Sequence, residues 1–582
     1  MAATSAPTGI RTARVRQRRR PPGIGRGVLA LACAFFFLWP VAMVVIGVFR
    51  TGLPGTAESG WSLGGLADVF TSANTYSVLG QTVVLAVSVT AASTLLAVFF
   101  AWVVARTDSP LRRLVTPTMV LVLATPPLFF AVSWDMLGNA RVGLLNQAFT
   151  AVTGAGSGPV NIESWAGLIF VSSLKAASFS YFLILGPFMS MDRSMEEASL
   201  LSGAGKARTF FGIHIPMLMP AISGAALLTM ISFLEAFDVP QVIGLPAGIH
   251  VLPTEVYSYI NATSGGQYAQ ASSLSLLLIV MVVALIAVQA RVLGRRQFTT
   301  VSGKTYRTER WRLGRTGWLC AAAIAAYVLL ALVLPLIQLY IGSFQTFYGI
   351  FAHPTLANYR TVLGDPEIIG AIRDTAMLAV LGGLVAMVIA VALARVARSS
   401  RGPVTRFISA SAWMPMALPG IVLGLGIMWS YLSVPGLNKL YATPWILLIG
   451  LFVAAIPVAM RSAEGALAQI PGDLEDAARI SGASRGRAFV RMVLPLIAPS
   501  FLSGWLLAGI LIASNLAVPV LLASPLSNTV SVEVLKLYQG GDVPQAAAVF
   551  AVMLTAIAVV AAVLGVVRAV LVRAAARRKE TA

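Results

Sequence analysis

The sequence predicts an all-α polytopic membrane protein with about 12 transmembrane helices, arranged as two tandem six-helix parallel repeats. The first observation behind this prediction is composition. Of 582 residues, 57% are hydrophobic and only 11% are charged, whereas a soluble globular chain carries roughly 25% charged residues. The mean hydropathy is +0.83. The other two observations are a series of apolar stretches of membrane length and a repeat of the first half of the chain in the second. Together they exclude a soluble enzyme.

Twelve apolar stretches are long enough for a helix to cross a hydrocarbon core, which takes about 20 residues. In the first half they cover residues 29–49, 78–104, 114–137, 165–189, 219–237 and 271–288. In the second half they cover residues 318–341, 375–396, 407–432, 441–460, 501–522 and 546–567. The arginine-rich segment before the first stretch imitates a secretory signal, but no small-x-small cleavage site precedes Thr51. The first stretch is therefore predicted to remain as a membrane helix.

The basic residues are concentrated on one side of the predicted membrane. Of the 42 Lys and Arg residues, 35 fall on the side that holds both termini. Five fall on the other side, and Arg373 and Lys175 lie at a helix mouth and within a span. Since cytoplasmic loops are rich in Lys and Arg, both termini are predicted to be cytoplasmic in a multi-pass protein of the inner (cytoplasmic) membrane. The net charge of +20 then indicates contact with anionic membrane lipid rather than nucleic-acid binding.

The two halves of the chain share residues at fixed offsets. Under an offset of 295, Pro40 recurs as Pro335, and under 293, Thr82 and Pro126 recur as Thr375 and Pro419. Under an offset of 279, nine residues between 196 and 220 recur: Glu196, Ala198, Ser202, Gly203, Ala204, Arg208, Phe210, Pro216 and Pro220 match Glu475, Ala477, Ser481, Gly482, Ala483, Arg487, Phe489, Pro495 and Pro499. An even number of spans in each half gives both halves the same orientation, related by a pseudo-two-fold axis along the membrane normal.

This repeat divides the chain into five predicted parts. Two halves of six spans each cover residues 28–290 and 318–570, and a basic cytoplasmic linker, residues 291–317, joins them. A disordered basic cytoplasmic tail, residues 1–27, precedes the first half, and a cytoplasmic tail, residues 571–582, follows the second. The repeat therefore decides the domain organisation.

The best-matched segment of each half is a polar cytoplasmic loop. In the first half its candidate site residues are Glu197, Ala198, Ser199 and Gly203, and in the second half they are Asp476, Ala477, Ala478 and Gly482. Small residues allow a partner surface to approach a short helix closely, and each glycine supplies the turn to a second short helix. A proline then begins the next membrane helix, where its missing N–H is not needed.

This pattern resembles the E-A-A, three residues, G, nine residues, I-x-L-P loop of permease subunits of ATP-binding-cassette importers, and the resemblance covers residues 28–570. It implies the type I importer permease fold, in which the loop is a coupling helix that sits in a cleft of an ATPase subunit. The sequence departs from the pattern at Asp476, where glutamate is usual, and at Ser199, where alanine is usual. Because Asp is one methylene shorter, the carboxylate contact of the second half is expected to be weaker or aimed differently.

The chain itself is not expected to be an enzyme. Residues 303–305 imitate the end of a phosphate-binding loop, but Phe298 stands where that loop needs glycine. Residues 263–267 imitate an ATPase signature, yet they lie in an external connection. ATP is therefore expected to be used by a separate ATPase subunit, in two copies. No bound cofactor and no metal site are expected, because the two cysteines and three histidines are isolated.

The cargo is predicted by resemblance. Fused halves, together with residues 233–240 and 244–248, resemble the ferric-iron branch of these importers, with thiamine, polyamine and aminoethylphosphonate permeases as alternatives. Acidic external connections suit a cationic cargo or a basic face of an extracytoplasmic substrate-binding protein, although the exclusion of Lys and Arg would also produce them. A different class, a secondary transporter of twelve spans, would need ionisable residues within the spans of both halves.

Four ionisable residues are candidates for the translocation path: Lys175, Glu235, Asp238 and Asp135. Lys175 lies ten residues past Trp165, hence about 15 Å below the outer boundary, and Glu235 lies within a vertical distance of about 7 Å of it. We therefore predict an ion pair between Lys175 and Glu235, with Asp238 and Asp135 as alternative partners, that faces the path between the halves. The alternative is a structural Lys175 that extends outward or donates to helix carbonyls.

Overall fold

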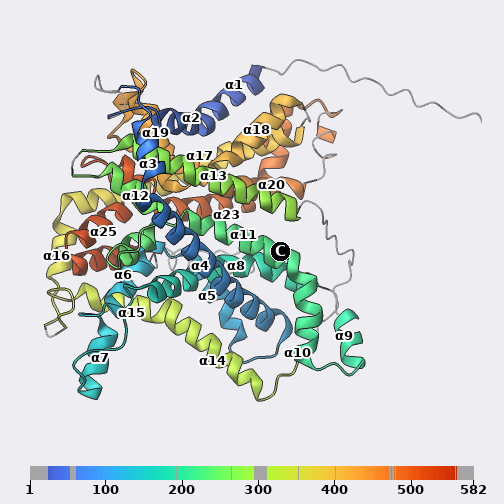
Figure 1. Cartoon of the computed structure of the whole chain (residues 1–582). Helices are drawn as coiled ribbons and strands as arrows, with labels where there is room; N and C mark the ends of the chain where they lie inside the picture. The colour runs from blue at the N-terminus through green and yellow to red at the C-terminus, as the bar shows by residue number, and fades with distance from the viewer. Residues whose placement is uncertain are drawn as a thin grey trace, which may run out of the picture.

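The computed structural model describes residues 24–52, 60–191, 194–263, 265–293, 311–351, 353–399, 402–470, 474, 477–478, 480–557 and 559. Within these ranges the regular secondary structure is helical, and β-bridges occur only at isolated places. Figure 1 shows the long helices side by side. This confirms an all-α polytopic fold. Of the predicted tails and linker, residues 1–23, 294–310 and 571–582 lie outside the described ranges.

Nine helical stretches of the described chain are long and apolar enough to cross a membrane. They are Gly25–Gly47, Ala73–Arg106, Trp165–Ser190, Lys206–Leu234 and Tyr268–Arg291 in the first half, and Thr316–Ser343, Pro366–Arg398, Pro444–Ala468 and Gly486–Ala513 in the second. A shorter apolar helix, Val543–Ile557, occupies the described part of the twelfth predicted span. Each of these ten segments overlaps a stretch predicted from hydropathy, although Lys206–Leu234 and Gly486–Ala513 begin 13 and 15 residues earlier than predicted.

The long stretches and their connections contain these elements. The first half comprises α1 (Ile24–Cys33), η1 (Ala34–Leu38), α2 (Trp39–Gly47), α3 (Gly64–Thr71), α4 (Ala73–Arg106), α5 (Arg112–Ala124), α6 (Pro127–Gly138), α7 (Leu144–Thr153), α8 (Trp165–Ser190), α9 (Ser194–Leu201), α10 (Lys206–Thr209), η2 (Phe210–His214), α11 (Ile215–Leu234), η3 (Pro240–Gly244), α12 (Leu252–Ile260) and α13 (Tyr268–Leu293). The second half comprises α14 (Thr316–Val328), η4 (Leu329–Val333), α15 (Leu334–Ser343), α16 (Ala357–Gly364), α17 (Pro366–Ser399), α18 (Pro403–Trp413), η5 (Met414–Ala417), α19 (Gly420–Leu432), η6 (Leu437–Leu440), α20 (Pro444–Ala468), α22 (Arg485–Ala488), η7 (Phe489–Val493), α23 (Leu494–Ala513), α24 (Pro519–Leu522) and α25 (Val530–Gln539).

The third predicted span of each half, over residues 114–137 and 407–432, consists of two helices that meet at a sharp bend. The helices Arg112–Ala124 and Pro127–Gly138 meet at 100°, and Pro403–Ala417 and Gly420–Leu432 meet at 115°. Pro126 and Pro419, which correspond under the offset of 293, lie at the two bends. Proline has no N–H to donate and disfavours helical geometry in the residue before it, so each helix ends there.

The sequence offsets reappear in the helix boundaries. The helices α4 and α17 are both 34 residues long and start 293 residues apart, and α11 and α23 are both 20 residues long and start 279 apart. The π-helical turns η1 and η4 correspond under the offset of 295, and η2 and η7 under 279. The duplication therefore preserved the local geometry of each helix as well as its hydropathy.

A matched hydroxyl explains one of the repeated residues. The hydroxyl of Thr82 on α4 accepts a hydrogen bond of 2.9 Å from the backbone N–H of Leu252, in the first turn of α12. The hydroxyl of Thr375 on α17 accepts the corresponding bond, also 2.9 Å, from the N–H of Val530 in α25. The first N–H groups of a helix have no partner within that helix. Thr82 and Thr375 supply one in each half.

The first membrane helix of each half packs against the other half. In Figure 1, α1 and α2 lie beside α18 and α19, whereas α14 and α15 lie beside α5 and α6. At the α2 to α19 crossing, a Cβ on Gly426 would lie 2.6 Å from the carbonyl oxygen of Pro40, so glycine permits this close approach. The two repeats are therefore interlocked units rather than separate six-helix bundles.

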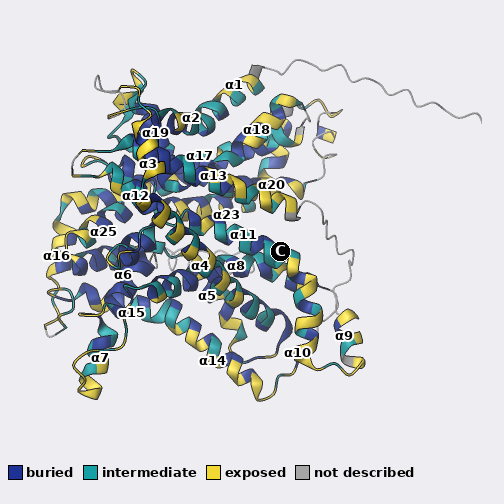
Figure 2. Cartoon of the chain, in the orientation of Figure 1, coloured by how far each residue is buried: buried dark blue, intermediate teal, exposed yellow. Residues whose placement is uncertain are grey.

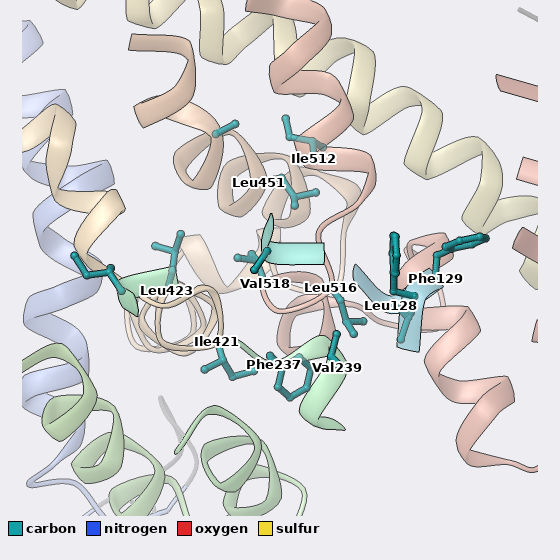
Figure 3. Close-up of a cluster of buried hydrophobic side chains, with 14 of the residues drawn as sticks. Leu128, Phe129, Phe237, Val239, Ile421, Leu423, Leu451, Ile512, Leu516 and Val518 are labelled. Atoms are coloured by element: carbon teal, nitrogen blue, oxygen red, sulfur yellow. The ribbon is translucent and has the colours of Figure 1, made fainter. Parts of the chain in front are cut away.

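Buried apolar side chains fill the centre between the halves. Figure 2 shows buried residues along the inner helices, and exposed ones at the two ends of the bundle and along the outer faces of helices such as α4 and α14. The cluster in Figure 3 contains three pairs of residues that correspond under the repeat offsets: Leu128 and Ile421, Phe237 and Leu516, and Val239 and Val518. All six are at most 7% exposed. We call these six residues the central plug.

Candidate functional site

The predicted first-half loop forms two short helices at one end of the bundle. The helix α9 carries Glu197 and Ala198 exposed and Ser199 half-buried, and Gly203 follows it with φ +81. The hydroxyls of Ser199 and Thr209 lie 3.0 Å apart and link α9 to α10. Figure 1 shows α9 and α10 projecting from this end, which we call the basic face, and α7, α12, α16 and α25 at the opposite face. The loop therefore presents its carboxylate and small residues outward.

The second-half loop repeats this turn. Gly482 has φ +88, and Ala483 donates its N–H to the carbonyl oxygen of Ala478, as Ala204 does to Ser199 in the first half. Ala477 is exposed and Ala478 is buried. Asp476 lies outside the described residues. A positive φ strains any residue with a Cβ, so glycine is needed at the same point in both copies.

The sequence reasoning missed an apolar side chain at each loop. Leu201 is 89% exposed and Ile480 is 88% exposed, and they correspond under the offset of 279. An exposed large apolar residue in a polar loop is typical of a protein contact. The pair does not stand out in the sequence repeat because leucine and isoleucine are similar but not identical.

Three buried polar side chains anchor the first-half loop, and they also escaped the sequence reasoning. Arg106 at the end of α4 lies with Nη1 3.5 Å from Oε2 of Glu196 on α9, and Nε2 of His214 lies 3.1 Å from the same oxygen. All three side chains are at most 4% exposed. Glu196 was noted only as a repeated residue, because a sequence offers no signal that Arg106, 90 positions earlier, contacts it.

The predicted ion pair between Lys175 and Glu235 is wrong. Nζ of Lys175 donates to the carbonyl oxygens of Val122, Leu123 and Thr125, at 2.5, 2.9 and 2.5 Å. The carbonyls of Val122 and Leu123 lie in the last turn of α5. Their helical donors would be the nitrogens of Pro126 and Pro127, which carry no hydrogen. Thr125 is the C-cap of the same helix. A cation at a helix C-terminus satisfies free carbonyls and complements the helix dipole. The hydrogen bonds to helix carbonyls that the alternative predicted for Lys175 are present.

Glu235 and Asp238 lie beside the central plug. Both belong to the break between α11 and η3, on either side of Phe237. One oxygen of each carboxyl group, Oε1 of Glu235 and Oδ1 of Asp238, is buried without a hydrogen-bond partner. The second half has Ser514 and Ala517 at the corresponding positions. Carboxylates therefore occur on one side of the plug only.

Asp135 ties the two halves together near the opposite face. Its Oδ2 accepts a hydrogen bond of 2.8 Å from the hydroxyl of Tyr348, and its Oδ1 accepts one of 3.3 Å from Asn139. Tyr348 belongs to the second half. The carboxylate, only 1% exposed, is thus held by partners other than Lys175. In the described part of the chain, no three His, Cys, Asp or Glu side chains converge as a metal site.

Comparison with known proteins finds the same family domain in both halves of the chain. Residues 93–296 and 374–581 each match the family model described as "Binding-protein-dependent transport system inner membrane component". Two similar proteins are a ferric transport system permease protein, FbpB, of Actinobacillus pleuropneumoniae (25% identical over 82% of this chain and 68% of that protein) and an Fe(3+)-transport system permease protein, FbpB 2, of Haemophilus influenzae (24% identical over 64% and 71%).

A third similar protein, FbpB 1 of Haemophilus influenzae, is 27% identical over 66% of this chain. The match spans 60% of that relative's length. The family model matches once in each half of the chain. The repeat found from sequence offsets therefore corresponds to a repeated family domain.

Proposed function

Because the chain belongs to the family of binding-protein-dependent transport system inner membrane components, we propose that it is the fused permease of an ATP-driven importer. It lies in the cytoplasmic membrane with both termini inside and translocates a solute delivered by an extracytoplasmic binding protein. The observation that carries this proposal is the pair of matched loops on the basic face, each with a glycine at positive φ and an exposed apolar tip.

Each loop is the docking element for one ATPase subunit. Glu197 and Ala198 in the first half and Ala477 in the second are exposed, and Leu201 and Ile480 supply apolar anchors of the kind that carry binding energy at interfaces. Asp476 is the corresponding carboxylate of the second loop. The permease itself hydrolyses no ATP and binds no cofactor, and two ATPase copies supply the energy.

The cargo is ferric iron, translocated as a substrate and not held at a resident site. One carboxyl oxygen of Glu235 and one of Asp238 are buried beside the central plug without a hydrogen-bond partner, and burying a polar atom without a hydrogen bond is costly. A passing cation would offset that cost. Ferric transport relatives also favour this cargo, whereas thiamine, polyamine or aminoethylphosphonate are the alternative cargoes.

The central plug is the closed barrier of the path, and the candidate path residues Glu235 and Asp238 lie next to it. Lys175 and Asp135 act beside the path, as a helix cap and as a contact between halves. A secondary transporter would instead carry coupling charges in both halves, yet Ser514 and Ala517 replace the carboxylates in the second half.

The test is uptake of radiolabelled ferric iron by cells that produce the chain with its ATPase and binding protein. We expect uptake that needs ATP and that Glu235→Gln with Asp238→Asn lowers about tenfold, while Glu58→Gln, an external change far from the plug in sequence, leaves it unaltered. Uptake of thiamine or a polyamine, without uptake of iron, would show that ferric iron is not the cargo. Uptake by the chain alone in an ion gradient would overturn the importer class.

A further inference from the structure

The cluster of Arg106, Glu196 and His214 joins four parts of the first half at the basic face. Arg106 ends α4, Glu196 lies in the first turn of α9, and His214 ends η2. Nη2 of Arg106 also donates to the carbonyl oxygens of Phe188 and Met191, at 3.1 and 2.7 Å, where α8 ends. One guanidinium therefore connects the second and fourth spans to the loop helix.

The linker between the halves closes this cluster. The indole ring of Trp311 stacks on the imidazole of His214 with centroids 5.2 Å apart and planes at 25°. The backbone N–H of Trp311 donates to the carbonyl oxygen of Arg106 at 2.9 Å. Thr107 and Trp311 also form a parallel β-bridge. Trp311, at the described end of the linker, therefore contacts the same two residues, Arg106 and His214, that hold Glu196 of the loop.

The second half reproduces only a part of this arrangement. Arg398 donates to the carbonyl oxygens of Leu467 and Ile470, which correspond to Phe188 and Met191 under the offset of 279. Val493 stands at the position of His214. A valine can neither bond a carboxylate nor accept a stacked indole. The arginine clamp is common to both halves, whereas the histidine and the stacked linker belong to the first.

We propose that Arg106, Glu196 and His214 are positioning residues that lock the first-half loop helix α9 to the ends of α4 and α8. The loop then moves with these membrane helices as one body when an ATPase subunit pulls on it. Trp311 of the linker is part of this lock. The first-half loop is therefore held more rigidly to its membrane helices than the second-half loop is. This inference rests on the proposed importer function, because it concerns what the loop transmits.

The physical reason is the cost of a loose charge in a buried site. If Arg106 is removed, the Glu196 carboxylate keeps His214 but loses the Arg106 guanidinium, and breaking a buried ion pair from one side is strongly destabilising. The helix α9 must then shift to reach water. If both charges are removed, no buried carboxylate has lost its arginine, so α9 no longer has to shift. The hydrogen bonds from Arg106 to Phe188 and Met191 at the end of α8 are lost all the same. The residues therefore behave as a coupled unit.

The first experiment measures iron transported per ATP hydrolysed by the full complex in proteoliposomes. We expect Glu196→Gln and Arg106→Met each to lower this ratio about tenfold, His214→Val to lower it about threefold, and the double variant Arg106→Met with Glu196→Gln to be no worse than the worse single. The matched control is Tyr181→Phe. It removes one part-buried side-chain hydrogen bond, 2.7 Å to the hydroxyl of Thr116, that involves none of the three lock residues, and it should leave the ratio unchanged.

A second measurement needs no cargo and no ATPase. Amide hydrogen exchange of residues 194–203 in the purified chain should rise about tenfold in Glu196→Gln and stay unchanged in Tyr181→Phe, because local opening frees the loop amides. Unchanged exchange, or an equal rise in the control, would overturn the lock. A wild-type complex that transports no iron would instead overturn the proposed function, and the exchange result would still decide whether α9 is locked.

Discussion

The ammonium group of Lys175 lies 2.5 Å from the carbonyl oxygen of Thr125, at the bend between α5 and α6. Because Nζ also reaches the carbonyls of Val122 and Leu123, this side chain serves as the C-terminal cap of a broken membrane helix. The second-half helix at the corresponding bend has no such cap, since Ala454 stands at the position of Lys175. The two bends are alike in angle but differ in what stabilises them.

The first prediction concerns this cap. Lys175→Met leaves three carbonyls at the end of α5 without their donor, so the free energy of unfolding should fall by about 3 kcal/mol. The measurement is thermal unfolding in detergent. Ala454→Met is the matched control and should change little. Since Lys175 does not pair with Glu235, adding Glu235→Gln should not restore stability. A double variant more stable than Lys175→Met alone would contradict this structure.

The second prediction uses the repeated threonines. Thr82→Val and Thr375→Val keep the side-chain shape but remove the acceptor for the N–H of Leu252 or Val530. Each should lower the free energy of unfolding by about 1–2 kcal/mol. Because the two hydrogen bonds have the same length and role, the two substitutions should lower the free energy of unfolding by equal amounts. The same unfolding assay measures both, and a large loss in one half with none in the other would break the equivalence.

The third prediction concerns the tips of the two loops. Leu201→Ser and Ile480→Ser remove exposed apolar surface, so each should weaken retention of the ATPase subunit about tenfold, while the stability of the chain stays the same. Co-purification at graded detergent and salt measures retention. Met195→Ser, another exposed apolar residue of α9, is the control for a general loss of apolar area. Full retention in the variant with both tips changed would remove these residues from the interface.

The fourth prediction is a pH dependence at α25, outside the long spans. Burial raises the pKa of Glu533 above its ordinary value of 4.5, although Lys536 opposes the shift. The folded state therefore keeps this proton to higher pH than the unfolded state does. As a result, the stability contributed by Glu533 falls as the pH rises above about 4.5 and levels off once the folded carboxyl ionises. Glu533→Gln should flatten that part of the stability curve. An unchanged stability curve in Glu533→Gln would contradict this prediction.

The fifth prediction concerns sidedness. Ser157→Cys, in the exposed connection after α7, should react with an impermeant thiol reagent added to intact cells. Ser202→Cys and Ser481→Cys, on the exposed loops of the basic face, should react only after the cells are opened. Cys33 and Cys320 are buried, so the background should be low. Reaction of Ser202→Cys from outside would reverse the membrane orientation.

Hydropathy predicted the spans and residue offsets predicted the duplication, because both are properties of the linear sequence and do not depend on how the helices pack. A stretch of apolar side chains predicts a membrane helix wherever its partners lie, and the match of Gly203 to Gly482 survives as a matched positive φ. Whether Glu235 and Asp238 line the path stays a prediction. The acidic residue of the second loop, Asp476, lies outside the described residues.

The sequence by itself determined which segments span the membrane, that they occur twice, and where the two polar loops lie. Only the tertiary structure decided that the first span of each half packs on the other half, that Lys175 caps α5 instead of pairing with Glu235, and that Arg106 holds Glu196. Lys175 and Thr125 are 50 residues apart, and Arg106 and Glu196 are 90 apart. A buried charge takes whichever partner the helix packing brings within reach, and in an interlocked bundle that packing depends on the whole chain.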